Sequence, residues 1–187
     1  EQTLIAFPLF LVGVFSLAEN RLDLIILSGY FPENIVGYYS AAIFLETALL
    51  IFPEGIKNAI FPVFSKQINH NPKNNEKIYS LVFKYVLLIS LAVSFGSIIK
   101  APSILSVIYK KDFIESVNTF RLLMISFPFL SISLINLRFL NASNKDSQVA
   151  KIYGLTMIFS LIMNLILIPK FDGVGAAAVR LVSTFIL

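Results

Sequence analysis

The sequence predicts an all-α fold, a polytopic transmembrane helical bundle. Of the 187 residues, 57% are apolar and only 14% are charged, and the mean hydropathy is +0.81. Soluble domains are roughly 45–50% apolar and about 25% charged. The apolar residues also gather into runs close to the roughly 20 residues that a membrane-spanning helix needs. These observations exclude an ordinary soluble domain, a disordered segment and a collagen-like fibre.

Six apolar runs account for the expected helices. Because the backbone must satisfy its own hydrogen bonds in lipid, long apolar runs imply helices. The gaps are short and contain the Pro and Gly residues that stop helices, so neighbouring helices should be antiparallel. The expected helices cover about residues 3–27, 35–65, 78–99, 117–140, 149–168 and 174–187, the last of them truncated.

The two ends of the sequence bear on domain organisation. The chain begins with Glu1 rather than Met and ends at Leu187 inside an apolar run. We therefore expect an internal piece of a longer protein, in which residues 1–187 form a single transmembrane lobe. Lys and Arg near the run ends favour a cytoplasmic position for the loops that follow the second and fourth runs.

Several kinds of chemistry are excluded by the composition and the motifs. There is no cysteine and a single histidine, His70, so we expect no disulfide and no Cys or multi-His metal site. No phosphate-binding glycine loop, GxSxG or HExxH motif is present, so we expect no catalytic residues, no enzyme activity and no cofactor. The net charge is +4, but the cations lie mostly between apolar runs, which predicts membrane orientation rather than a nucleic-acid partner.

Charged residues inside the apolar runs are the candidates for function. An ionisable group at mid-bilayer costs roughly 2.5–3.5 kcal/mol, so it usually faces a partner or a water-filled cavity. In the first run, Glu19 and Asp23 are four residues apart and share a helix face. Arg21 points elsewhere, so it should meet another helix or a cavity. The alternative is that these residues lie near the interface and extend toward water.

The second run carries Glu46, Glu54 and Lys57. Glu46 lies about eleven residues past Ile35, hence roughly 16 Å deep at the helical rise of 1.5 Å per residue. It has no local partner and is the best candidate for a cavity-lining or proton-linked carboxylate. Glu54 and Lys57 are three residues apart and can pair on one face, which would make them a structural feature.

Two further cations lie inside later runs. Lys84 is about seven residues into the third run, where it can extend to the surface or face a central cavity and attract anions. Arg180 lies about six residues past Val174 in the sixth run, and no role is assigned to it. Four aromatic residues near one predicted interface suit an aromatic belt: Tyr30, Phe31, Tyr38 and Tyr39.

Three stretches resemble a known superfamily. RLDLIILSGYFPENIVGYYSAAIFLE (21–46) has an Asp in a helix, a short loop and a Gly-x-Tyr-x-x-Ala helix start. AIFPVFSK (59–66) is similar to the family's helix end, and NLILIPKFDGVGAAAVRLVSTF (164–185) to its Asn-Leu-x-x-Ile-Pro turn and Gly-Ala-Ala. The chain resembles the polysaccharide biosynthesis and O-antigen flippase branch of the multidrug/oligosaccharidyl-lipid/polysaccharide exporters. The match is to the family's C-terminal half.

The resemblance implies a function and partners. It implies a flippase in the cytoplasmic membrane that moves a lipid-diphosphate-linked sugar between two helical lobes, of which the N-terminal lobe is missing here. Cations would attract the diphosphate, and carboxylates would couple an ion gradient to the movement. Burial depth and charge, rather than the resemblance, select Arg21, Lys84 and Lys57 for substrate binding and Glu46, Asp23 and Glu54 for ion coupling.

Three other functions remain open from the sequence. A multidrug or small-cation antiporter of the same fold would have a cavity dominated by unpaired acids. A non-transporting membrane scaffold would bury its charges in pairs and have no central cavity. A membrane-embedded glycosyltransferase or ligase would normally carry catalytic carboxylates in a sizeable polar loop, which none of these short loops provides.

Overall fold

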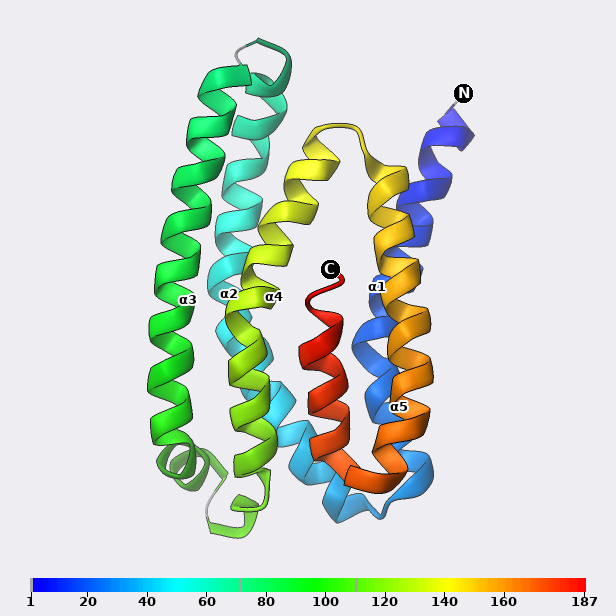
Figure 1. Cartoon of the computed structure of the whole chain (residues 1–187), viewed down its shortest axis with the longest axis vertical. Helices are drawn as coiled ribbons and strands as arrows, with labels where there is room; N and C mark the ends of the chain where they lie inside the picture. Colours follow the sequence, from blue (N-terminus) through cyan, green and yellow to red (C-terminus); the bar gives the residue numbers. More distant parts are fainter. Residues whose placement is uncertain (1, 71, 110) are drawn as a thin grey trace.

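The computed structural model describes residues 2–70, 72–109 and 111–187, and the side chains of 10–66, 74–109 and 112–187. Within these ranges every regular element is a helix, and short turns join the helices (Figure 1). The elements are α1 (Gln2–Tyr30), α2 (Glu33–His70), α3 (Pro72–Tyr109), the short 3₁₀ helix η1 (Lys111–Phe113), α4 (Ser116–Ala142) and α5 (Asp146–Ser183). The predicted all-α fold is therefore confirmed.

The predicted count of six helices is not matched, because α5 contains both the fifth and the sixth apolar run. The short gap expected at residues 169–173 is a tight turn inside α5. The chain stays helical on both sides of one residue, Asp172, whose backbone angles are φ 48° and ψ −136°. This residue reverses the chain direction, so the final segment runs back along the bundle (Figure 1).

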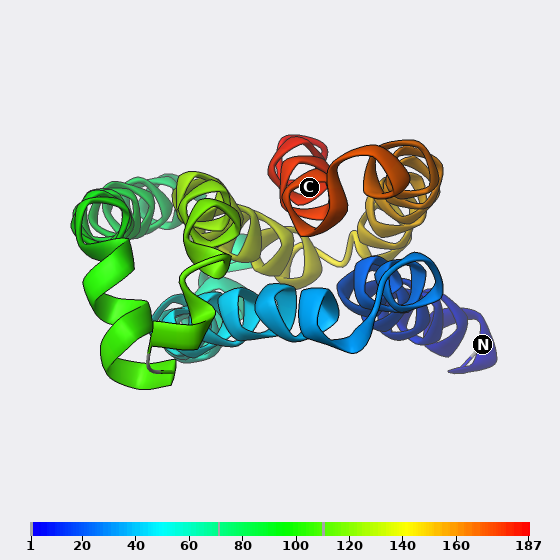
Figure 2. The ribbon, with the colours of Figure 1, turned by 90° about the horizontal axis from the view of Figure 1, so that it is seen from below.

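The helices run antiparallel, as the short gaps predict. The N-terminal end of α1, the end of α2, the start of α3 and the α4–α5 connection lie at one end of the bundle (Figure 1). The α1–α2 turn, the short helix η1 and the turn inside α5 lie at the other end. Figure 2 shows α3 at one edge and α1 at the opposite edge. Between them α4 packs on α2, α3 and α5, while α1 packs mainly on α5.

The outer surface of the bundle is apolar. Four helical segments are long and apolar enough to cross a membrane: Glu33–Lys66, Asn74–Tyr109, Ser116–Ala142 and Asp146–Ser183. α1 stays a predicted span. Large apolar side chains such as Ile51, Ile99 and Val107 are more than 70% exposed. A soluble protein rarely exposes so much contiguous apolar surface, whereas lipid covers it in a membrane protein. The chain is therefore a multi-pass membrane protein.

Small residues let the last segment of α5 approach its neighbours closely. Ala176 and Ala177 are fully buried in the core. A Cβ atom at Gly173 would lie 3.2 Å from the Tyr39 side chain, and one at Gly175 would lie 2.6 Å from the Leu167 carbonyl oxygen. Membrane helices associate through such small residues. This close packing brings Arg180, on the same segment, into the centre of the bundle.

Candidate functional site

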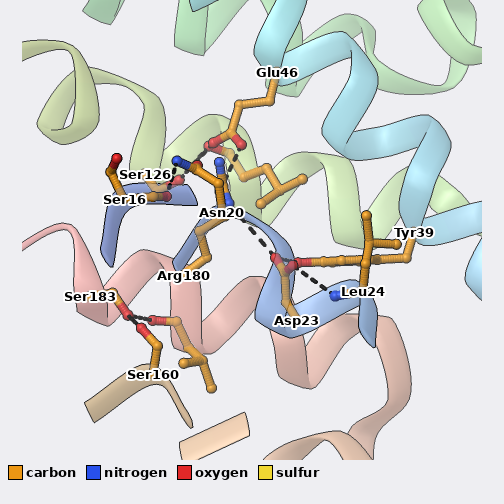
Figure 3. A network of polar contacts seen from close by, with 12 residues as sticks. Ser16, Asn20, Asp23, Leu24, Tyr39, Glu46, Ser126, Ser160, Arg180 and Ser183 are labelled. Carbon is orange, nitrogen blue, oxygen red and sulfur yellow. Dashed lines mark hydrogen bonds and ion pairs between the residues drawn. The ribbon is translucent and has the colours of Figure 1, made fainter. Parts of the chain in front are cut away.

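Four helices meet around Arg180 in a buried group of side chains that we call the charge cluster (Figure 3). Its members come from α1, α2, α4 and α5 and are Asp23, Tyr39, Glu46, Ser126 and Arg180. Arg180 Nε donates a hydrogen bond of 2.9 Å to Glu46 Oε2. Arg180 Nη1 lies 3.7 Å from Asp23 Oδ2. One guanidinium thus joins carboxylates from two other helices.

The carboxylates of the charge cluster are also held by neutral donors. The Tyr39 hydroxyl donates to Asp23 Oδ2 at 2.6 Å, and the Leu24 N–H donates to Asp23 Oδ1 at 2.7 Å. Ser126 Oγ donates to Glu46 Oε1 at 3.3 Å. Asp23 is only 3% exposed and Glu46 is fully buried. Buried charges persist when their geometry is good and their remaining hydrogen-bonding positions are filled, which is the case here.

A small polar cavity borders the charge cluster on the α5 side. It has a volume of about 10 Å³, and Glu19, Asp23, Ser160, Asn164 and Arg180 contribute to its wall. Asn164 Oδ1 is buried and has no hydrogen-bond partner in the described part of the chain. Glu19 adds a third carboxyl group beside one guanidinium, so acidic side chains outnumber basic ones around this cavity.

A larger groove, lined by both polar and apolar side chains, lies between α1 and α2. Its volume is about 670 Å³. The two helices meet at their shared turn and separate toward the opposite end of the bundle (Figure 1). Apolar residues line part of the groove, and its polar lining consists of Asn20, Arg21, Thr47, Glu54, Asn58 and Arg180. Arg180 therefore belongs both to the charge cluster and to the wall of this groove.

The structure places the predicted site residues in three different environments. Arg21 is exposed and faces the α1–α2 groove, one of the two positions that its spacing predicts. Glu54 lines the same groove and forms the predicted ion pair with Lys57. Lys84 is exposed and is not part of the groove wall. It belongs to α3, the helix at the opposite edge of the bundle (Figure 2).

The two acidic candidates Asp23 and Glu46 lie together in the charge cluster. Glu46 has a partner that sequence reasoning missed, Arg180, which follows it by 134 residues. The prediction that Tyr39 belongs to an aromatic belt is wrong, because Tyr39 is only 1% exposed and its hydroxyl donates a hydrogen bond to Asp23. One feature of the sequence could have identified Arg180 as a buried residue. It is a cation inside an apolar run, and the run also contains a Gly-Ala-Ala stretch of the kind that lets membrane helices pack closely. Among the described side chains, no three His, Cys, Asp or Glu residues are grouped to hold a metal ion.

The fold and the site together define a multi-pass membrane protein with a polar groove beside buried, paired charges. The sequence from residue 4 to residue 187 matches the family model described as lipid II flippase MurJ. The chain belongs to this family, which lies within the exporter superfamily that the sequence motifs indicate.

Two curated relatives match most of the chain. The "Probable low-salt glycan biosynthesis flippase Agl15" of Haloferax volcanii is 24% identical over 163 residues, 87% of this chain and 34% of the relative. The uncharacterized membrane protein MJ1068 of Methanocaldococcus jannaschii is 26% identical over 177 residues, 92% of this chain and 34% of the relative. The chain thus spans about a third of the length of these relatives.

Two solved structures share the fold. One is a MOP superfamily transporter from Pyrococcus furiosus, and the other is a multidrug resistance MATE family transporter of the MOP superfamily in an outward-facing conformation. Each has a TM-score of 0.81 and 17% sequence identity, with 97% of this chain and 41% of the solved chain covered. At this identity the likeness shows the arrangement of the helices alone.

Proposed function

We propose that residues 1–187 form one helical lobe of a transporter that moves a lipid-linked oligosaccharide across the cytoplasmic membrane by alternating access. The family of lipid II flippases and the relative named as a glycan biosynthesis flippase support this proposal. The observation that carries it is the polar α1–α2 groove, whose wall includes Arg21 and Arg180 within a bundle that is apolar on its outside.

The groove suits a cargo with a polar, anionic head and an apolar tail. Arg21 has no ion-pair partner in the described part of the chain and is exposed to the groove, so its guanidinium is available to a diphosphate. Lys57 is paired with Glu54 and contributes less. The second lobe of the complete protein would close the other side of the groove, and the lipid tail would remain in the bilayer.

The charge cluster suits a coupling role in this account. Asp23 and Glu46 share Arg180, and Glu19 adds a carboxylate with no ion-pair partner in the described residues. A proton or cation can balance this excess charge and change how strongly Arg180 is held. Because Arg180 also lines the groove, a change in its ion-pair partners would change how its guanidinium interacts with the cargo. Glu54 can act similarly through its pair with Lys57.

The narrower assignment within the superfamily rests on the motifs alone. The order of the Asp, Gly-x-Tyr-x-x-Ala and Asn-Leu-x-x-Ile-Pro elements favours a polysaccharide or O-antigen repeat unit as the sugar. The match to the lipid II flippase family leaves the sugar open, but both cargoes share the lipid-linked diphosphate on which the proposal depends.

Two alternatives make different predictions. A multidrug or small-cation antiporter of the same fold is favoured by the excess of carboxylates around Arg180, and it would move a lipophilic cation instead of an anionic lipid. A non-transporting scaffold is favoured by the pairing of Glu46 with Arg180 and of Glu54 with Lys57. The groove of about 670 Å³ beside those pairs argues against the scaffold.

The test is a flipping assay on the complete protein in proteoliposomes, with a fluorescent lipid-diphosphate-linked oligosaccharide. We expect Arg21→Ala to slow flipping about tenfold or more, because a charge-assisted hydrogen bond is worth about 1.5–3 kcal/mol. Arg21→Lys should restore part of the rate. Lys84→Ala, on the far edge of the bundle, is the comparison variant and should have the smaller effect. Flipping by Arg21→Ala at the wild-type rate would contradict the proposal, as would transport of a lipophilic cation alone.

A further inference from the structure

A second groove lies on the other side of α1, between α1 and the first half of α5. Its volume is about 560 Å³, and its lining is apolar except near Ser147 and Lys151. Phe15 forms part of one wall and Gly154 part of the other. A Cβ atom at Gly154 would lie 3.2 Å from the Phe15 ring, so the absence of a side chain lets this ring pack closely against α5 in the groove wall.

The length of this groove matches one leaflet of a bilayer. Its lining runs along α5 from Ser147 to Ile158, which is about 16 Å at the helical rise of 1.5 Å per residue. This is about half of the roughly 30 Å hydrocarbon thickness. The groove begins near the start of α5, at the same end of the bundle as the α4–α5 connection (Figure 1). It therefore extends from one membrane interface toward the bilayer centre.

The charge at the groove mouth is that of Lys151. Lys151 is exposed and forms no ion pair among the residues that the structure describes. Its long side chain can lie along the apolar wall while its ammonium reaches the interface. Basic residues between transmembrane helices at such an interface bind anionic lipid head groups.

We infer that this groove binds one anionic phospholipid, with an acyl chain along Phe15 and Gly154 and the phosphate at Lys151. Ser147 lies one helical turn before Lys151 and adds a hydroxyl donor at the same mouth. The site differs from the α1–α2 groove, whose α1 residues are Leu17, Asn20 and Arg21. It does not depend on which cargo the transporter moves.

The site can be tested by native mass spectrometry of the complete protein in detergent, with phosphatidylglycerol and phosphatidylcholine added in equal amounts. Wild-type protein should retain phosphatidylglycerol about tenfold better than phosphatidylcholine. Lys151→Ala should abolish this preference, and Ser147→Trp, which fills the exposed mouth, should reduce retention of both lipids. Lys145→Ala is the matched control, because Lys145 is an exposed lysine just before α5 and outside the groove lining, and it should behave like wild type.

Three results would overturn the inference. Equal retention of the two lipids by wild type would show that charge plays no part. An unchanged preference in Lys151→Ala would place the head group elsewhere. No retained lipid in wild type would show that another segment of the complete protein covers the groove.

Discussion

Arg180 on the last segment of α5 and Glu46 on α2 form a hydrogen-bonded ion pair, with 2.9 Å between Nε and Oε2. Glu46 is fully buried, and the same guanidinium reaches Asp23 on α1. The pair ties the end of the chain to two helices that lie far before it in sequence. Because Arg180 also lines the α1–α2 groove, the pair links the packing of the lobe to its proposed cargo site.

Removal of Arg180 should destabilise the lobe more than removal of either acid. In Arg180→Met, two buried carboxylates lose their counter-charge, and breaking a buried pair typically costs about 3–5 kcal/mol. We expect Glu46→Gln to be milder, because the amide still accepts from Ser126 and Arg180 keeps Asp23. Thermal unfolding of the complete protein in detergent measures both. In the double variant that combines Arg180→Met with Glu46→Gln, the loss of unfolding free energy should differ from the sum of the two single losses by at least about 1 kcal/mol. Additive losses would show that the two side chains act independently.

The Tyr39 hydroxyl should contribute measurably to stability. In Tyr39→Phe the 2.6 Å hydrogen bond to Asp23 is lost and a buried carboxylate oxygen loses a donor, which costs about 1–3 kcal/mol. Tyr38→Phe is the matched control, because the Tyr38 ring packs edge-on against Phe113 and the substitution keeps that ring. Equal unfolding temperatures for the two variants would contradict the assigned role of Tyr39.

The helical class and most helix positions were predictable because apolar runs and their interruptions are local features of the sequence. The Glu54–Lys57 pair was predictable for the same reason, since both residues lie on one helix at a spacing of three. The orientation of Arg21 away from Asp23 also followed from helical geometry. Each of these predictions needs no knowledge of how separate helices pack.

The charge cluster was not predictable in the same way, because its bonds join residues from four helices. Glu46 and Arg180 are each isolated in their own apolar runs, and only the packing of α2 against α5 reveals them as partners. Tyr39 was misplaced at an interface because its position near a helix start was considered without its neighbour Asp23. The count of helices differs at Asp172, where the chain turns within α5 at a single non-helical residue.

The turn inside α5 should depend on the conformation of Asp172. A non-glycine residue with φ 48° and ψ −136° is strained, and such strain costs about 1–3 kcal/mol. The Asp172 side chain offsets part of it, because Oδ1 accepts the N–H of Val174 at 3.1 Å. We expect Asp172→Gly to keep or raise the unfolding temperature and Asp172→Val to lower it, since a β-branched residue disfavours positive φ. A similar unfolding temperature for both variants would mean that the turn carries no strain.

If the α1–α2 groove is the cargo site, it is a water-accessible surface within an otherwise lipid-facing bundle, and cysteine labelling tests this most directly. The chain has no native cysteine, so single cysteines can be introduced into a complete protein from which any others have been removed. Thr47 lies in the groove lining, so Thr47→Cys is the test variant. Phe52 is exposed on the same helix outside that lining, so Phe52→Cys is the control. We expect a membrane-impermeant thiol reagent to modify the cysteine at 47 but not the one at 52, and a lipid-diphosphate-linked oligosaccharide to protect position 47. Equal labelling of both positions, or labelling of neither, would contradict the account.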